Sequence, residues 1–289
     1  MTFNNPLAVD ENIDMKVTGI HLSGYSGILL VVFNSPKMVD GLGQFFKENW
    51  SDDTLVARSK DREVHCYTIT GDLSIYLKRY YVEGFKPFLR TALGLNKAQK
   101  AWRVGRRLKR RGLDTPLPIA LFNRGASRFS SEFVCITKGL SDAIDLHDAV
   151  LQVQGKDPSQ QRQKHDLIKA AAKFVALLHS HYIYHGDFSA DNILVRGIGD
   201  AQEIRIYLID LDAVRTSFWI SERRRIKNLE ELGRNFLDLR TISISDRVSF
   251  LKVYLKYYTR NRDSLHTLFR KARKRTEKRL ARYNQSFNK

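Results

Sequence analysis

The sequence contains only two cysteines and no long apolar run. Cys66 and Cys135 have neither the spacing of metal ligands nor the density of a disulfide framework, so two buried thiols in a reducing cytoplasm are expected. The longest apolar run, Ile28 to Phe33, is too short to span a bilayer. The start of the chain lacks the basic flank and long apolar core of a signal peptide. We therefore expect a soluble protein or one that sits on a membrane surface.

Acidic residues are few relative to basic ones, since 49 Lys and Arg oppose 31 Asp and Glu and leave a formal net charge of +18. The basic residues concentrate in two blocks. Lys252 to Lys289 holds 13 Lys and Arg against two acids, Asp263 and Glu277, whereas Lys97 to Arg111 holds eight basic residues and no acid. Such an excess favours polyanionic partners. We expect an anionic substrate or surface, and we do not expect nucleic acid.

Both basic blocks have the apolar periodicity of a helix. One apolar face contains Ala98, Ala101, Trp102, Gly105 and Leu108, and the other contains Leu265, Leu268, Phe269, Ala272, Leu280 and Tyr283. Each helix offers one face to a core or a bilayer and the other to solvent or anions. The first block is equally compatible with a solvated helix face, whereas the length and purity of charge in the second favour binding to an anionic membrane surface.

The chain is long enough to bury a core as one large domain or as two lobes. Residues 54–59, 64–70 and 74–82 predict three strands, 97–111 a helix, 111–124 an extended connection with two prolines, and 132–137 another strand. After Thr137 the pattern is mostly helical. We predict an α+β fold in two lobes: a small antiparallel-sheet N-lobe at 54–137 and a mostly helical C-lobe at 138–289. Residues 1–53, with a hairpin and a short helix, are expected to pack on the small lobe as an extension.

The stretch YHGDFSADNILV, Tyr184 to Val195, places a histidine, two aspartates and an asparagine within eight residues and then becomes apolar. Burial alone does not require these residue types. The apolar strand that follows and a second strand ending at Asp210 predict a β-hairpin with acids at both loops. His185, Asp187 and Asn192 keep the H-x-D-x-x-x-x-N spacing of a kinase catalytic loop, and Asp210 in IDLD occupies the place of the kinase metal aspartate.

Phosphoryl transfer explains why these residue types occur together. The site needs a divalent metal on hard oxygen ligands, a cation on the nucleotide phosphates and a carboxylate at the acceptor hydroxyl. Asn192 and Asp210 would hold Mg²⁺, Lys78 in the third strand would hold ATP phosphates, and Asp187 would orient or deprotonate the acceptor. His185 is expected to tie the loop to the core. Each residue alone would be a surface lysine or a turn residue, but the ordered set favours a kinase-like site.

The sequence resembles the lipopolysaccharide core kinases, the group that contains Kdo and heptose kinases. The resemblance covers roughly Thr54 to Tyr258 and rests on LKRYY, AWRVGRRLKRRGLDTPLPIAL, YHGDFSADNILV, YLIDLDAVR and NLEELGRNF. The H-G-D and I-D motifs are shared with aminoglycoside and choline phosphotransferases, whereas the basic helix that runs into RGLDTPLPIA points to the lipopolysaccharide group. The resemblance implies a protein-kinase-like fold and ATP-dependent phosphorylation of a sugar hydroxyl on a lipid-anchored glycan. It also implies a peripheral position on the inner face of the cytoplasmic membrane.

The sequence departs from the kinase pattern at three places. The turn ARSKDRE has no glycine, so Ser59, Lys60 and backbone amides would have to contact the nucleotide phosphates. The basic helix lacks the glutamate that pairs with the strand lysine, so Lys78 needs another partner. Asp212 stands where kinases have a glycine and is either a third carboxylate of the metal site or a solvated turn residue.

Two alternatives to a lipopolysaccharide-type kinase remain. One is a kinase for a small soluble alcohol or an aminoglycoside, and the other is a non-catalytic, membrane-associated pseudokinase. The charge of +18 favours an anionic glycolipid over a cationic aminoglycoside. The intact set of Lys78, Asp187, Asn192 and Asp210 favours an active enzyme over a pseudokinase.

Overall fold

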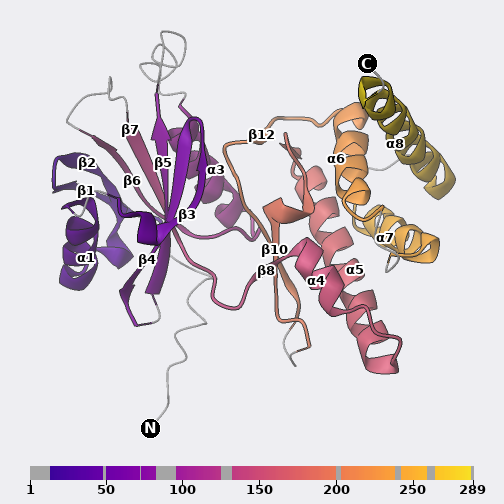
Figure 1. The fold of residues 1–289 in the computed structure, drawn as a ribbon, viewed down its shortest axis with the longest axis horizontal. Helices are drawn as coiled ribbons and strands as arrows, with labels where there is room; N and C mark the ends of the chain where they lie inside the picture. Colours follow the sequence, from indigo (N-terminus) through magenta and orange to yellow (C-terminus); the bar gives the residue numbers. More distant parts are fainter. Residues whose placement is uncertain are drawn as a thin grey trace. The chain divides into compact units, whose positions relative to one another are not determined.

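The structure is a computed structural model that describes residues 14–47, 50–71, 73–82, 96–124, 132–199, 203–237, 242–258 and 264–287. Residues 1–13 of the predicted extension lie outside the described residues, as do the side chains of Leu280 and of 282–287. The chain divides into two compact units, Met1–Ser141 (unit 1) and Asp142–Lys289 (unit 2), and each is described by itself (Figure 1). The lobe boundaries expected after residues 53 and 137 stay a prediction.

A seven-stranded antiparallel sheet forms the body of unit 1 (Figure 1). Its spatial order is β1-β2-β6-β7-β5-β4-β3, so the N-terminal hairpin joins the sheet where β2 pairs with β6. Helix α1 packs against β1 and β4, and helix α3 packs against β5, β6 and β7. The elements are β1 (Val17–Leu22), β2 (Tyr25–Leu30), α1 (Pro36–Lys47), β3 (Leu55–Ser59), β4 (Arg62–Thr70), β5 (Leu73–Tyr81), α3 (Lys97–Arg110), β6 (Pro118–Arg124) and β7 (Glu132–Lys138).

The residues predicted as an extended connection, 111–124, contain one of the inner strands of this sheet. Strand β6 begins at Pro118, where the missing N–H is tolerated because it is the first strand position. Ile119, Ala120 and Phe122 in β6 are buried. A short apolar run that is buried on both faces has no alternation, which is why its periodicity does not reveal a strand.

Arg79 in β5 joins the N-terminal segment to the rest of unit 1. Its guanidinium donates to Glu132 at 2.8 and 3.0 Å and lies 4.6 Å from the ring centroid of Trp50. The hydroxyl of Tyr25 donates to the same carboxylate. Burial, reinforced by this hydrogen bond, raises the pKa of Tyr25 to about 12. Since Tyr25 and Trp50 precede residue 54, the described residues before 54 contribute to the sheet and to its core.

Helices make up most of unit 2, and a β-hairpin follows the His185 loop as predicted. Strands β10 and β11 pair antiparallel, with Ile193 opposite Leu208, and β11 ends two residues before Asp210. β8 adds to the edge of β10, and β9 pairs with β12. The elements are β8 (Ile144–Asp145), α4 (Leu146–Gln152), α5 (Pro158–Ser180), β9 (Ile183–His185), β10 (Ile193–Arg196), β11 (Arg205–Leu208), β12 (Val214–Thr216), α6 (Glu222–Arg234), α7 (Ile244–Tyr257) and α8 (Leu265–Phe287).

The basic C-terminal helix α8 packs against α6 and α7 inside unit 2. Leu268 is fully buried, and Phe269 and Ala272 are half-buried. The described part of the predicted apolar stripe therefore contributes to the core, whereas Leu280, Arg282 and Tyr283 lie outside the described side chains. Ion pairs between α6 and α8 join Glu222 to Lys271, Glu230 to Arg275 and Glu231 to Arg279. Among the described residues, no helix is both long enough and apolar enough to cross a membrane.

A neutral histidine lies in the centre of unit 2. His179 of α5 is fully buried; its Nδ1 accepts from the Tyr254 hydroxyl at 3.0 Å, and its Nε2 donates to Asn228 Oδ1 at 3.4 Å. The Tyr254 hydroxyl in turn accepts from Arg225 at 3.2 Å. Desolvation by burial lowers the pKa of His179 to about 3; the positive charge of Arg225 acts in the same direction, and the bond to Asn228 opposes it.

This buried histidine predicts a loss of stability in acid. The folded-state pKa lies below the ordinary value of 6.5, so the unfolded chain binds the proton more readily and stability falls as pH decreases through this range. Between pH 7.5 and pH 5.0, His179 should lower the free energy of unfolding by about 2 kcal/mol. Chemical unfolding of wild type and His179→Gln at both pH values measures this difference.

Tyr254→Phe is the matched control, because it removes one hydrogen bond of the network but keeps the imidazole. It should be less stable at both pH values and retain most of the pH dependence. Equal pH dependence in wild type and a cooperatively unfolding His179→Gln variant would contradict the prediction.

Candidate active site

His185 connects the two loops that carry the predicted site residues of unit 2. Its Nδ1 accepts from the backbone N–H of Asp187 at 3.3 Å, and its Nε2 donates to the carbonyl oxygens of Ile209 and Asp210 at 3.3 and 3.2 Å. The ring is almost completely buried, and burial lowers its pKa, although these backbone bonds oppose the shift. A neutral imidazole with the proton on Nε2 satisfies all three contacts. The geometry therefore fits the predicted tie between loop and core.

Asn192 completes the loop. Its side-chain N–H groups donate to the carbonyl of Asp187 at 2.9 Å and to Ser189 Oγ at 3.1 Å, while its backbone carbonyl accepts from the backbone N–H of Ile209 at 3.0 Å. Both hydrogen-bonding groups of the Asp187 backbone are thus fixed, yet its side chain is exposed. The amide nitrogen of Asn192 is engaged within the loop, which assigns Oδ1 to any cation that the residue holds.

Asp210 adopts a left-handed backbone conformation, with φ of 57°. The turn that it opens is closed by a hydrogen bond from the N–H of Ala213 to the Asp210 carbonyl at 3.1 Å. A non-glycine residue in this region is uncommon and is often found at functional positions. Asp212 is half-buried in the same turn.

Gly186 has a steric reason to be glycine. Its N–H donates to the carbonyl oxygen of Ala213 at 3.1 Å, and a Cβ added at Gly186 would lie 3.1 Å from the same oxygen. A side chain there would push β12 away from the loop. The middle position of H-G-D is therefore explained by the close approach of the two backbones.

Side chains of helix α6 form hydrogen bonds with the loop, an arrangement that the sequence pattern does not reveal. The buried Asn228 accepts from the N–H of His185 at 3.2 Å and donates to its carbonyl at 2.7 Å. Lys227 donates to the Tyr184 hydroxyl at 2.7 Å and to the Gly186 carbonyl at 3.0 Å, and Asn235 accepts from the N–H of Ala190 at 3.2 Å. Two α6 side chains and Asn235, the residue directly after α6, thus hold the loop. Their only sequence signal was a run of polar residues on a helix.

The remaining predicted site residues belong to unit 1. Lys78 lies in β5, between β4 and β7, and is half-buried. Ser59 and Lys60 are exposed at the turn between β3 and β4. Helix α3 carries no acidic residue, as its sequence shows. The structure thus groups Asp187, Asn192, Asp210 and Asp212 in unit 2 and Lys78, Ser59 and Lys60 in unit 1.

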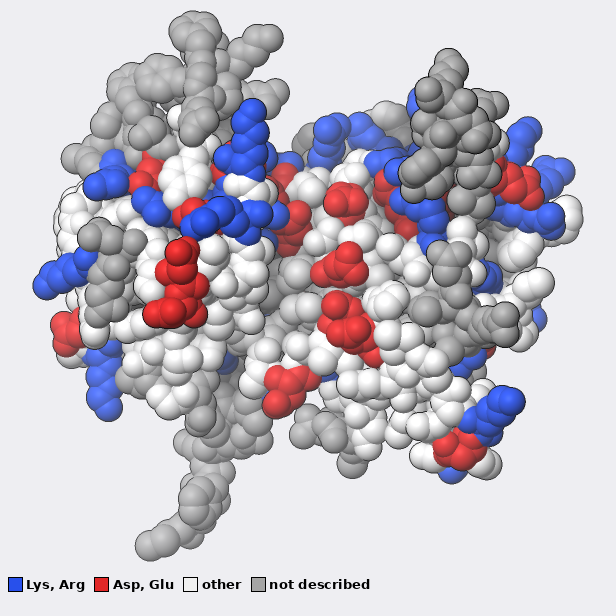
Figure 2. Space-filling view, in the orientation of Figure 1, with Lys and Arg blue, Asp and Glu red and all other residues white. Residues whose placement is uncertain are grey.

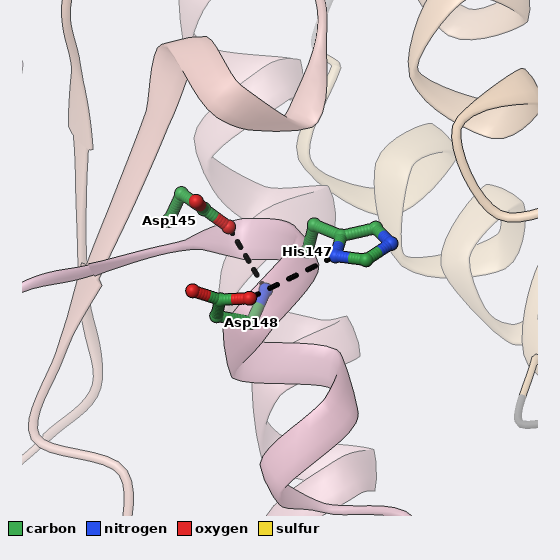
Figure 3. Close-up of side chains that lie close together, drawn as sticks. All are labelled: Asp145, His147 and Asp148. Atoms are coloured by element: carbon green, nitrogen blue, oxygen red, sulfur yellow. Dashed lines mark hydrogen bonds and ion pairs between the residues drawn. The ribbon is translucent and has the colours of Figure 1, made fainter.

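A cluster of Asp145, His147 and Asp148 at the start of α4 has the composition of a metal site (Figure 3). Its geometry is also that of a helix cap, because Asp145 Oδ1 accepts from the backbone N–H of Asp148 at 2.8 Å. His147 Nδ1 lies 3.8 Å from Asp148 Oδ1, and its ring stacks on Phe236. Capping and stacking account for the cluster, which the sequence did not single out.

Unit 2 also contains an apolar cavity of about 670 Å³ between α4, α5, α6, α7 and α8. Its lining includes Ala171 and Leu251 from the core helices and Phe269 and Ala272 from α8. Its lining also includes the charged residues Asp246 and Arg247. A volume of this size accommodates a small apolar ligand.

Three comparisons place this architecture among known proteins. The lipopolysaccharide core heptose(I) kinase WaaP of Pseudomonas aeruginosa is 27% identical over 173 residues, which cover 59% of this chain and 64% of that protein. WaaP of Escherichia coli is 27% identical over 188 residues, which cover 63% and 70%. The chain thus spans slightly less than two thirds of the length of the first relative.

Among solved structures, "WaaP in complex with acyl carrier protein" matches 78% of this chain and 88% of that one, with a TM-score of 0.60 and 21% identity. This likeness confirms the predicted kinase-like α+β fold. Residues 48–254, well over half of the chain, match the Lipopolysaccharide kinase (Kdo/WaaP) family. The resemblance seen in the sequence is therefore confirmed, and this protein belongs to the lipopolysaccharide kinase (Kdo/WaaP) family.

Proposed function

We propose that this protein is an ATP-dependent phosphotransferase that phosphorylates a sugar hydroxyl, of the Kdo or heptose type, in a lipopolysaccharide core or a similar lipid-linked glycan. The observation that carries the proposal is the buried His185 ring, which fixes the Asp187 loop against Asp210 in a member of the lipopolysaccharide kinase family. The relatives named as heptose(I) kinases support the acceptor class.

The donor atoms at the site fit Mg²⁺. Asp210 offers a carboxylate and Asn192 an amide oxygen, which are hard ligands of the kind this ion prefers. Mg²⁺ on the nucleotide phosphates would neutralise charge that develops during transfer. Asp210 and Asn192 would hold it, and Asp212 would either join them or remain a turn residue.

Asp187 is the proposed catalytic carboxylate. Its backbone is fixed by His185 and Asn192 while its side chain is exposed, so it can approach an acceptor hydroxyl and orient it or take its proton. Lys78 would hold the nucleotide phosphates, with Ser59, Lys60 and backbone amides of the β3–β4 turn contributing. We infer these roles from the residue types and from their positions in the sequence.

The exposed cations of α8 support a position on the inner face of the cytoplasmic membrane. Lys271, Arg275 and Arg279 pair with acids of α6, but Arg270, Lys274 and Lys278 are exposed. Cations near an anionic leaflet each contribute about 1 kcal/mol. A peripheral kinase held in this way would remain close to a lipid-anchored acceptor, and its binding would weaken with salt.

Acyl carrier protein is a further candidate partner, because the structural relative was solved in complex with it. The unit 2 cavity is mostly apolar and is lined in part by the basic helix α8. We propose that this cavity holds the acyl chain of an acylated carrier protein.

The two alternative functions differ from the proposal in what they require. A kinase for an aminoglycoside needs an acidic pocket for a cationic substrate, which the net charge of +18 disfavours. A pseudokinase needs no ATP turnover. Mass spectrometry of lipid-linked glycans from cells with and without the gene tests the proposal directly, because the mutant glycan should lack one phosphate.

Asp187→Asn should leave the fold intact and lower the rate of phosphoryl transfer by roughly 10² to 10⁴, the range expected for loss of a general base. The matched control is Asp191→Asn, which removes another exposed carboxylate of the same loop and should change the rate little. Steady-state kinetics with a lipid-linked acceptor measures both. An unchanged rate for Asp187→Asn would remove this residue from the mechanism.

Asp210→Asn should abolish Mg²⁺-dependent ATP turnover, because it removes the ligand charge. Asparagine tolerates the left-handed backbone, so this variant separates charge from strain better than Asp210→Ala does. Lys78→Ala should mainly raise the KM for ATP. Asp212→Asn in the same assay decides between its two roles. If Asp210→Asn retains full Mg²⁺-dependent turnover, the metal assignment is wrong.

Ala272→Phe should narrow the cavity and weaken binding of acylated carrier protein by at least several-fold, because the added ring occupies space lined by α8. Binding of the unacylated carrier should remain as in wild type. Calorimetric titration with both carrier forms measures the two affinities. Equal affinity of wild type for both forms would show that the cavity does not hold the acyl chain.

A further inference from the structure

Two aromatic side chains of unit 2, in the segment between β12 and α6, are exposed to solvent. Phe218 is 96% exposed and Trp219 is 66% exposed, whereas the other exposed large apolar residues in the described chain are aliphatic. The segment is held at both ends, since the N–H of Ser217 donates to the carbonyl of Tyr182 at 3.3 Å and Ser221 caps α6. Exposed adjacent aromatic rings on an anchored segment indicate a binding surface.

Basic residues flank the aromatic pair in the sequence. Arg215 precedes it in β12 and is exposed, and Arg223 and Arg224 follow it in the first turn of α6. Positive charge in the first turn of a helix opposes the helix dipole, so the exposed Arg223 does not stabilise α6 through the dipole, whereas Arg224 lies 5.6 Å from the ring centroid of Tyr184. The one acid of this turn, Glu222, is paired with Lys271 of α8.

The Glu222–Lys271 ion pair joins the basic helix α8 to the first turn of α6. The turn of α8 that contains Lys271 also carries the exposed Arg270 and Lys274. Figure 2 shows Lys and Arg side chains gathered along the α6 and α8 side of unit 2. The aromatic pair therefore lies three to four residues before Glu222, whose partner Lys271 is next to the exposed Arg270 in α8.

We propose that Phe218 and Trp219 insert into the interfacial layer of an anionic bilayer while Arg215, Arg223 and the exposed α8 cations contact lipid headgroups. The inference rests on the proposed function, because it docks the kinase on the membrane that carries its acceptor. Tryptophan is suited to this layer, since its apolar ring and polar N–H match the boundary between acyl chains and headgroups. The neighbouring cations complement anionic lipid, which favours a bilayer over an apolar protein groove.

The tryptophan content of the chain supplies a direct test. The chain has three tryptophans, and Trp50 and Trp102 are 8% and 4% exposed. Lipids with brominated acyl chains quench only nearby fluorophores, so they should quench Trp219 selectively. Vesicles of phosphatidylglycerol and phosphatidylcholine containing such lipids should quench the wild type and shift its emission to the blue. Trp219→Phe should lose both effects and still bind the vesicles.

The double variant Phe218→Ser/Trp219→Ser should bind these vesicles at least roughly tenfold more weakly by co-sedimentation. The matched control, Val31→Ser/Val32→Ser, removes two exposed apolar side chains from unit 1 and should bind like the wild type. Arg270→Gln/Lys274→Gln should reduce binding at low salt but leave quenching of the bound fraction unchanged. Undiminished binding of the aromatic double variant, or no quenching of Trp219 in bound wild type, overturns the proposal.

Activity on a soluble sugar fragment separates this inference from the proposed function. The aromatic double variant should phosphorylate the fragment at the wild-type rate. If the wild type phosphorylates the fragment but Trp219 is not quenched, only the membrane inference fails. If Trp219 is quenched but no ATP is turned over, only the proposed function fails. If the double variant loses activity on the fragment while it binds vesicles normally, the aromatic rings contact the glycan and the bilayer proposal is wrong.

Discussion

The hydrogen bonds between Asn228 and the backbone of His185 hold the candidate site of unit 2 in place. Through them α6 fixes the residue whose ring binds both the Asp187 loop and the carbonyl of Asp210. The same Asn228 oxygen accepts from His179, so the site and the polar centre of unit 2 share one amide. Loss of that amide would leave several buried polar groups without partners, and each such group costs about 1–3 kcal/mol.

Local sequence patterns predicted much of this site because its parts are close in the chain. His185, Asp187 and Asn192 lie within one loop, and the β10–β11 hairpin brings Asp210 back to it. The supporting side chains on α6 and directly after it were not predictable in the same way. Lys227, Asn228 and Asn235 reach the loop from more than 30 residues away, and polar residues on a helix usually face solvent. Only tertiary packing shows that this polar face is turned inward.

The charge pattern correctly predicted that α8 is a basic amphipathic helix, but it did not show which of its charges form ion pairs. The sequence predicted an amphipathic basic helix, and the structure contains one. Composition could not show that Lys271, Arg275 and Arg279 pair with acids of α6, nor that Leu268 is buried. Part of the positive charge stabilises packing within unit 2. The attraction of this helix for anions is therefore set by fewer residues than a count of Lys and Arg suggests.

The pairing of β2 with β6 has a consequence for the order of folding. Ser26 lies opposite Asn123, so nearly 100 residues must be synthesised before the N-terminal hairpin can find its place in the sheet. Until then the edge of β2 is unpaired, and Phe46 of α1 lacks Phe122 of β6, on which its ring packs. Contacts of such long range slow folding because the loop must close first. During synthesis, β2 therefore keeps an unpaired edge until β6 is made, and such an edge can pair with another chain.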